Sequence, residues 1–507
     1  MLDDAAQGSA EPRRFAPGGW AFPVAAAVSM FVLAALALSK FPAMGDAAEL
    51  TLALALAGIP HPTGYPLYVL GGHLFVRALH AAGFSWVVAA SLWSAAGAAV
   101  ALGAFARCVQ HVIAATLDEH EVWPPLVGVG LVSPVIALAL NPVWIANASG
   151  AEVYSWSDAT LFVAAAFMLG KLRSLEDASS PADRATARTA LRWGLLCGVC
   201  LTFHLTSAAA VVAMTTALVA AHARLGRWRL SHALIGLAAA LLPLASYGWI
   251  AWRAAHPAAF QWPVEPTFAS WWMHVSGAAY THFLGGFSPS ETERQLIRVA
   301  LLPFILPGIG LGAVFALRAR SWALRWGLLS LLAGSALQIL FVSFYSVPDA
   351  SSYFLPSLMA SLLIGGSALL STSRRLSIAA LSMGAVLVIG LGAWSFTRVV
   401  ADRKLLAQVD AGIRDAWKRV PFDRGIVLWA DDHYHRFVLL QVLEGQRPDL
   451  YVDDPDMLSW PPRRRAFERR FGFDPLGGRP IRSPGDIERI PQIIRARAKV
   501  PVLILPQ

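Results

Sequence analysis

The sequence predicts an α-helical, polytopic membrane protein with a small α/β domain at its C-terminus. Of the 507 residues, 56% are hydrophobic and only 14% are charged, whereas a soluble domain carries about 25% charged residues. The charge is also uneven, because residues 398–507 hold 20 of the 41 Lys and Arg residues and 15 of the 32 Asp and Glu residues. We therefore expect a membrane domain over residues 1–397 and a polar domain over residues 398–507.

Apolar runs of about 17–25 residues without charges mark the expected membrane spans. The run 193–222 is longer than one span needs, and two short helices turning at His204 would place the basic residues after it inside the cell. One long helix is the alternative. With two helices in this run, eleven spans are expected at about residues 20–39, 84–106, 124–141, 154–170, 193–222, 231–252, 297–317, 322–345, 354–371 and 376–396.

The distribution of Lys and Arg predicts a cytoplasmic N-terminus. The segments expected inside carry 16 Lys and Arg residues, and the outside segments before residue 398 carry five, as the positive-inside rule requires. Residues 107–123 are an exception, because three acidic residues outnumber Arg107 there. The first span is expected to be retained rather than cleaved as a signal peptide. We expect a multi-pass protein of a bacterial inner membrane with a periplasmic C-terminal domain, and the net charge of +9 then reflects cytoplasmic loops rather than nucleic-acid binding.

Two short apolar runs, residues 425–430 and 500–505, are typical of buried strands and support an α/β domain at the C-terminus. The three cysteines all fall in apolar segments. Cys197 and Cys200 form a C-x-x-C pattern, but the spacing is common by chance on an apolar helix and no second pair accompanies it. We therefore do not expect a functional thiol pair.

The loop after the first span contains two carboxylates that can serve chemistry. Asp46 and Glu49 are three residues apart at the start of a helix-forming segment, so they share one helix face. Local geometry supports two interpretations equally. The residues can be catalytic, or Asp46 can be an N-cap with Glu49 at the third position of a capping box.

The next segment combines three prolines and two glycines between Gly58 and Tyr68. This composition excludes a regular helix and predicts a rigid loop at the membrane surface. The loop carries His61, Tyr65 and Tyr68, which can hold a polar ligand beside the bilayer. A stiff connector with tyrosines at the interface is the alternative.

Further polar residues are expected at the outer ends of other spans, where an ionisable group is costly unless it is paired or functional. They converge on the same side of the membrane, which favours an outward-facing polar cavity, although for any one of them alone interfacial capping is the favoured interpretation. The residues are Glu152, Tyr154, Asp158, His204, Asp349 and Tyr353. The loop 253–296 adds scattered aromatic residues and histidines, which lack metal-ligand spacing and give a weak signal.

Several of these segments, in order, resemble a bacterial membrane family whose eukaryotic relatives are protein O-mannosyltransferases. The segment 45–50 resembles the acidic turn of that family, and the segment 61–68 resembles its His-Pro-Pro-Gly-Tyr-Pro-Leu-Tyr motif. The resemblance covers about residues 40–455 and continues through Glu152-Val-Tyr154, His204-Leu-Thr206, Pro348-Asp349…Tyr353-Phe-Leu-Pro356 and Gly445-Gln-Arg447-Pro448-Asp449. Thr63 and Ala47-Ala48 depart from the pattern without removing an ionisable group.

The resemblance implies the GT-C glycosyltransferase fold and a polyprenyl-phosphate-linked sugar as donor. Asp46 matches the acid of the first outer loop and is the expected catalytic base, and Glu49 is the second acidic position. Arg253, at the end of its span, is a further candidate for contacting the lipid phosphate. The expected substrate-binding residues are His61, Tyr65, Tyr68, Glu152, Tyr154, His204, Arg253, Asp349 and Tyr353.

The resemblance thus implies an inverting membrane glycosyltransferase that moves a hexose, expected to be mannose, to a protein hydroxyl or a glycan on the outer side. Its expected partners are the sugar lipid, the acceptor and membrane lipid. A metal is not obligatory for this reaction, because the leaving phosphate is already anionic, and the sequence contains no strong metal motif and indicates no other cofactor. A transporter or flippase of lipid-linked sugars is the first alternative, and a catalytically silent assembly or sensor protein is the second.

Overall fold

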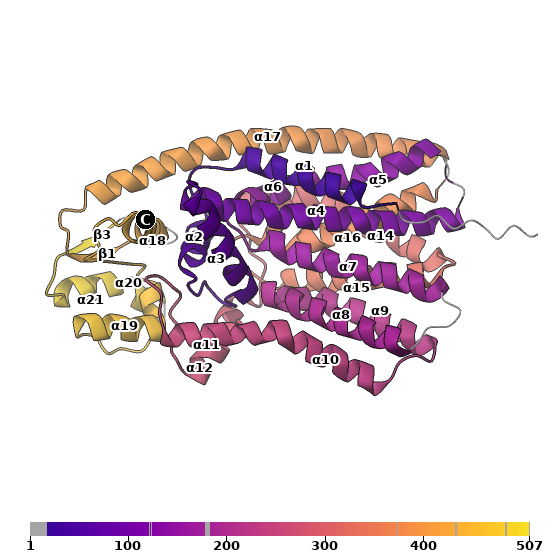
Figure 1. Ribbon diagram of the computed structural model, residues 1–507. Helices are drawn as coiled ribbons and strands as arrows, with labels where there is room; N and C mark the ends of the chain where they lie inside the picture. Colours follow the sequence, from indigo (N-terminus) through magenta and orange to yellow (C-terminus); the bar gives the residue numbers. More distant parts are fainter. Residues whose placement is uncertain are drawn as a thin grey trace, which may run out of the picture.

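The computed structural model describes residues 18–120, 122, 124–177, 183–372, 374–430, 433–481 and 484–505. Its long helices run side by side, and a small sheet with short helices lies at one end of the bundle (Figure 1). The helices that coincide with the expected spans are α1 (Ala21–Ala37), α4 (Trp86–Glu119), α5 (Pro124–Ala139), α7 (Tyr154–Asp177), α8 (Asp183–Phe203), α9 (Ala208–Arg224), α10 (Leu230–Leu244), α14 (Leu302–Arg318), α15 (Trp322–Val342), α16 (Leu355–Leu370) and α17 (Arg374–Lys418).

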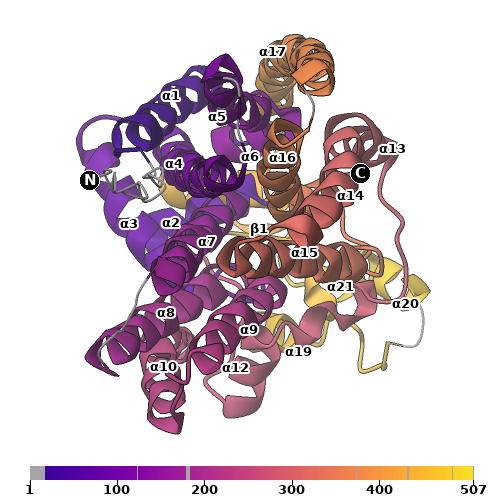
Figure 2. The same cartoon turned by 90° about the vertical axis from the view of Figure 1, so that its right-hand side faces the viewer.

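By length and composition, seven helices of the described part are able to cross a membrane, or up to eight if the α5–α6 pair, bent by 60°, is one span. The protein is therefore a multi-pass membrane protein, but the expected count of eleven spans is not confirmed. Helix α1, for example, has only 17 residues. Figure 2 shows the bundle from its end, with α17 on one outer edge and α10 on the opposite one.

The helix break expected at His204 is confirmed. Helix α8 ends at Phe203 and α9 begins at Ala208, with a 3₁₀ turn over Leu205–Ser207 between them. His204 has an extended backbone, and its Nδ1 lies 2.7 Å from the hydroxyl of Thr206. The side chain thus stabilises the turn that separates the two helices.

Helix α4 continues to Glu119, so most of the expected inside loop 107–123 is helical. Its acidic end has a structural role. The Asp118 carboxylate pairs with Arg173 at 2.8 Å, and the Glu119 carboxylate accepts hydrogen bonds from the backbone N–H groups of Arg320 and Ser321 just before α15. These contacts explain why the segment departs from the positive-inside pattern.

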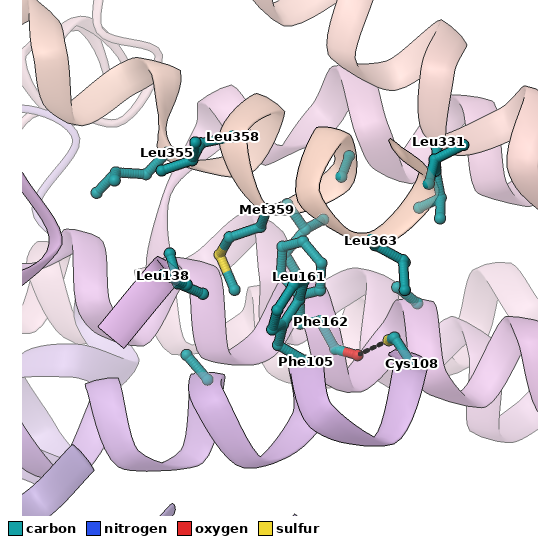
Figure 3. Packing of buried hydrophobic residues seen from close by; sticks show 14 of the residues in the cluster. Phe105, Cys108, Leu138, Leu161, Phe162, Leu331, Leu355, Leu358, Met359 and Leu363 are labelled. Atoms are coloured by element: carbon teal, nitrogen blue, oxygen red, sulfur yellow. Dashed lines mark hydrogen bonds between the residues drawn. The ribbon is translucent and has the colours of Figure 1, made fainter. Parts of the chain in front are cut away.

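The centre of the bundle is a close-packed apolar core (Figure 3). The rings of Phe105 on α4 and Phe162 on α7 meet edge to face at 5.7 Å, a favourable arrangement for aromatic pairs. The Cys108 thiol donates to the carbonyl oxygen of Phe162. Cys108, Cys197 and Cys200 are all buried free thiols.

Shorter helices lie at the end of the bundle beside the sheet (Figure 1). Helices α2 and α3 follow the first long helix, and α18 to α21 follow the last one. The shorter helices of the described part are α2 (Ala47–Leu56), α3 (Pro66–Ala81), α6 (Pro142–Ser149), α11 (Gly248–Ala255), α12 (Phe268–Val275), α13 (Glu291–Gln295), α18 (His433–Val438), α19 (Pro461–Phe471), α20 (Pro484–Glu488) and α21 (Ile490–Arg497).

The C-terminal part contains a three-stranded parallel sheet in the order β2-β1-β3. Strands β1 (Gly425–Leu428) and β3 (Val502–Ile504) lie where the sequence predicts strands, whereas β2 (Leu450–Asp453) was not predicted. The expected domain boundary at residue 398 falls inside α17, a single helix of 45 residues. The change in composition there marks a change in the surroundings of the helix, not its end.

Candidate functional site

A cavity of about 990 Å³ lies where α2, the loop before α3, the ends of several long helices and the C-terminal part come together. Nine of the eleven predicted site residues line it. They are Asp46, Glu49, His61, Tyr65, Glu152, Tyr154, His204, Asp349 and Tyr353. The tertiary structure therefore brings together groups from widely separated segments, as the sequence predicts.

Asp46 presents its carboxylate to this cavity rather than capping α2. The residue occupies the N-cap position but has helical dihedral angles, and no backbone N–H of the described part donates to its side chain as a cap. The side chain is 45% exposed. The capping interpretation is thus wrong, because a capping side chain needs an extended backbone to turn back onto the helix.

Glu49 is buried, and its carboxylate binds the Pro-rich loop. One oxygen accepts a hydrogen bond of 2.6 Å from the backbone N–H of His61, and the other lies 3.2 Å from the Nδ1 atom of the same residue. The Nε2 atom of His61 is 3.6 Å from the Asp46 carboxylate and 3.1 Å from the Tyr65 hydroxyl. His61 therefore lies between the two carboxylates.

The charges of Asp46, Glu49 and His61 affect the pKa values of Asp46 and His61. Burial lowers the pKa of His61, but the carboxylates of Asp46 and Glu49 outweigh it and raise this pKa to about 10. Burial raises the pKa of Asp46, and the His61 charge partly offsets the effect. Although the Asp46 side chain is 45% exposed, it faces a cavity with protein walls rather than bulk water. A carboxylate with a raised pKa is a stronger base.

The loop that carries His61 has a backbone that depends on glycine. Gly64 has a φ of +85° and Tyr65 a φ of +40°, conformations that are strained for residues other than glycine. A Cβ atom at Gly64 would also lie 2.5 Å from the side chain of Ile250. Pro66 then starts α3 at a position where its missing N–H costs nothing.

Aromatic residues form another part of the cavity wall. The Tyr154 hydroxyl donates a hydrogen bond to the Asp349 carboxylate, and the His204 ring stacks on Tyr65 with centroids 5.4 Å apart. The Tyr353 ring meets His204 edge to face at 5.7 Å. Burial and the nearby Asp46 charge raise the pKa of Asp349 to about 6, and the hydrogen bond from Tyr154 opposes the increase.

Two predicted site residues lie outside the cavity wall. The Tyr68 side chain is completely buried against Trp93, with ring centroids 6.4 Å apart. The guanidinium of Arg253 donates hydrogen bonds to the carbonyl oxygens of Leu56 and Ala57, at 2.6 and 2.8 Å. It thus satisfies carbonyl groups at the end of α2 and does not line the cavity, and its expected role as a phosphate contact stays a prediction.

The cavity also contains residues that the sequence analysis missed or ranked low. Trp262, Tyr280 and His282 come from the loop that gave only a weak signal, and Tyr434 and His435 come from α18. The run Asp431-Asp432-His433-Tyr434-His435 is dense in polar and ionisable residues, and that density is the signal that could have identified them.

One group in the described part has the composition and spacing of a metal site. Asp46, Glu49 and His61 each offer an oxygen or nitrogen atom, and these atoms all lie within 4.8 Å of one another. They come from α2 and the next loop, not from a linear motif. Sequence spacing alone therefore gave no metal prediction.

The fold and the cavity define a multi-pass membrane protein whose fold is similar to that of ArnT. The chain is similar to a crystal structure of ArnT from Cupriavidus metallidurans bound to undecaprenyl phosphate, with a TM-score of 0.51 and 15% identity over 87% of this chain and 91% of that one. The apo structure of the same protein gives a TM-score of 0.49 and 16% identity over 86% and 90%.

Residues 46–226 match the model of the TMEM260 N-terminal domain, which is described as a domain of a protein O-mannosyl-transferase. This result confirms the resemblance drawn from the segments around Asp46 and His61. Among curated proteins, none matches the sequence.

Proposed function

We propose that the protein is a glycosyltransferase that moves a hexose from a polyprenyl-phosphate donor to a hydroxyl group, with Asp46 as the base. The observation that carries this proposal is the position of the Asp46 carboxylate, which does not cap α2 and is open to a large cavity lined by residues of the family motifs. The match to a protein O-mannosyl-transferase domain supports mannose as the sugar and a protein hydroxyl or a glycan as acceptor. The undecaprenyl phosphate of the ArnT structure supports a lipid donor of this chemical class.

In the proposed reaction, Asp46 takes the proton of the acceptor hydroxyl while the oxygen of that hydroxyl attacks the anomeric carbon of the sugar. The bond between this carbon and the phosphate oxygen breaks, and the polyprenyl phosphate leaves with the electron pair. Because attack and departure occur on opposite faces, the anomeric configuration inverts. The hydroxyl groups of Tyr65, Tyr280 and Tyr353 line the same cavity and are candidates for hydrogen bonds to sugar or phosphate.

The location of the cavity favours this function over a flippase. A transporter binds its substrate near the middle of the membrane, between repeated halves. Here the wall includes the N-cap of α2, the loop before α3 and residues of the C-terminal part, all at one end of the bundle (Figure 1). We propose that this end faces the periplasm and that the protein lies in a bacterial inner membrane.

The test is transfer of radiolabelled mannose from polyprenyl-phosphate mannose in membranes, with extracytoplasmic protein and glycan as acceptors. Asp46→Asn should lower the rate by about 10²–10⁴ and leave the unfolding temperature unchanged. The control is Asp423→Asn, whose side chain is 87% exposed, and it should keep full activity. Equal transfer by Asp46→Asn and wild type would reject Asp46 as the base. Movement of the lipid between leaflets by wild type without any covalent transfer would support the flippase instead.

A further inference from the structure

A fourth potential ligand lies beside the Asp46–Glu49–His61 group. The Nε2 atom of His435, on α18, is 4.0 Å from the Glu49 carboxylate. Asp46 and Glu49 belong to the start of α2 and His61 to the following loop, so three separate segments meet here. The four side chains offer two carboxylates and two imidazoles.

The distances within this set are close to those around a bound metal ion. Bonds of about 2.0–2.2 Å to nitrogen and oxygen place the ligands of a tetrahedral ion about 3.3 Å apart. The Glu49 carboxylate lies 3.2 Å from His61 Nδ1 and 4.0 Å from His435 Nε2. The ligand atoms that Asp46, Glu49 and His61 offer all lie within 4.8 Å of one another.

His435 gives independent evidence for a ligand. Its side chain is 7% exposed, and neither of its ring nitrogens has a hydrogen-bond partner within the described residues. Leaving a polar group buried and unsatisfied costs about 1–3 kcal/mol, so buried side-chain nitrogens almost always have a partner. The ring packs edge to face on Phe260, with centroids 5.5 Å apart, and lines the cavity.

The charge of the cavity also favours a bound cation. This argument rests on the proposed function, in which the cavity binds the phosphate of a lipid donor. Among the described residues, those lining the cavity include no Lys or Arg. The lining does include six carboxylates, which would repel the phosphate of a lipid donor. They are Asp46, Glu49, Glu152, Asp349, Asp454 and Asp456. A divalent cation would reverse the local sign of the potential.

We propose that Asp46, Glu49, His61 and His435 bind a divalent transition-metal ion of the Zn²⁺ class. Two imidazoles favour Zn²⁺ over Mg²⁺ and Ca²⁺, which prefer ligand sets made of oxygen alone. A carboxylate has two oxygens, so Asp46 can contact the ion with one and an acceptor hydroxyl with the other. The competing arrangement is a protonated His61 held between two carboxylates with no ion.

The experiment measures metal binding directly, without a sugar donor. The purified full-length protein in detergent is treated with a chelator, dialysed and titrated with Zn²⁺, and bound metal is counted by mass spectrometry. Wild type should bind one ion per chain, and Mg²⁺ at the same concentration should not compete. His435→Gln and Glu49→Gln should weaken Zn²⁺ binding at least about 10-fold, since even changes outside the ligand set can cost that much. His256→Gln, which alters an exposed histidine outside the cavity lining, should bind as wild type does.

Wild type that binds no stoichiometric Zn²⁺ would overturn the proposal, and so would equal affinity in wild type and His435→Gln. If Glu49→Gln does not fold, His435→Gln still decides the question, because the His435 side chain has no hydrogen bond to lose in the described structure. Failure of the two proposals can be told apart. Protein that binds Zn²⁺ but transfers no sugar retains the metal site and rejects the glycosyltransferase.

Discussion

At the scale of the residue, two carboxylates three positions apart have different roles because their surroundings differ. Glu49 is 2% exposed and holds the backbone N–H and Nδ1 of His61. Asp46, 45% exposed, faces the cavity without a capping hydrogen bond. The first group organises the loop, and the second remains available for a substrate.

Asp349 provides a prediction on pH at this scale. Its pKa in the folded protein, about 6, lies above the ordinary aspartate value of 3.8. Its contribution to stability is therefore fully present below pH 3.8 and lost as the pH rises through about 6. Between about pH 4 and pH 7, wild type should thus lose more stability than Asp349→Asn, which cannot titrate. Thermal unfolding of both proteins in detergent measures this difference, and parallel curves across the range would contradict the raised pKa.

At the scale of the element, the loop between α2 and α3 depends on backbone conformations that its glycines and prolines make accessible. Gly64 has a positive φ and lies against Ile250, and the following residue, Tyr65, also has a left-handed backbone conformation. The Glu49 carboxylate holds the loop from one side through His61. The loop can thus present His61 to the cavity in one orientation.

Gly64→Ala should destabilise the protein by about 1–3 kcal/mol through backbone strain, with an added cost for the contact with Ile250. Gly83→Ala is the matched control, because Gly83 also has a positive φ, of +95°, but a Cβ there meets no atom within 4 Å. Gly64→Ala should therefore unfold at a lower temperature than Gly83→Ala. Equal unfolding temperatures would show that the close approach to Ile250 does not matter.

At the scale of the whole molecule, the C-terminal part completes the cavity. The guanidinium of Arg436, on α18, donates hydrogen bonds to the carbonyl oxygens of Pro42 and Ala43 at 3.2 and 2.9 Å, just before Asp46. The neighbouring His435 reaches Glu49. Helix α17 joins the bundle to this part as one continuous helix, so the two are connected by a stiff element.

Arg436→Gln should weaken this contact, because hydrogen bonds from charged groups contribute about 1.5–3 kcal/mol each. We expect faster hydrogen–deuterium exchange in α18 and slower sugar transfer, with the exchange of α4 and α7 unchanged. Arg469→Gln, at an exposed position on α19, is the control and should match wild type in both measurements. Unchanged exchange in α18 of Arg436→Gln would show that the C-terminal part docks without this contact.

The sequence by itself determined the long apolar helices, the break at His204, the rigid loop with His61, and nine of the residues that line the cavity. These features depend on neighbours within a few residues, through apolar length, proline and glycine content, and helical spacing. Only the tertiary structure decided that Asp46 does not cap α2, that Arg253 binds the end of α2, and that His435 lies beside Glu49. Such contacts join segments far apart in the chain, and they depend on how the helices pack, which no local pattern specifies.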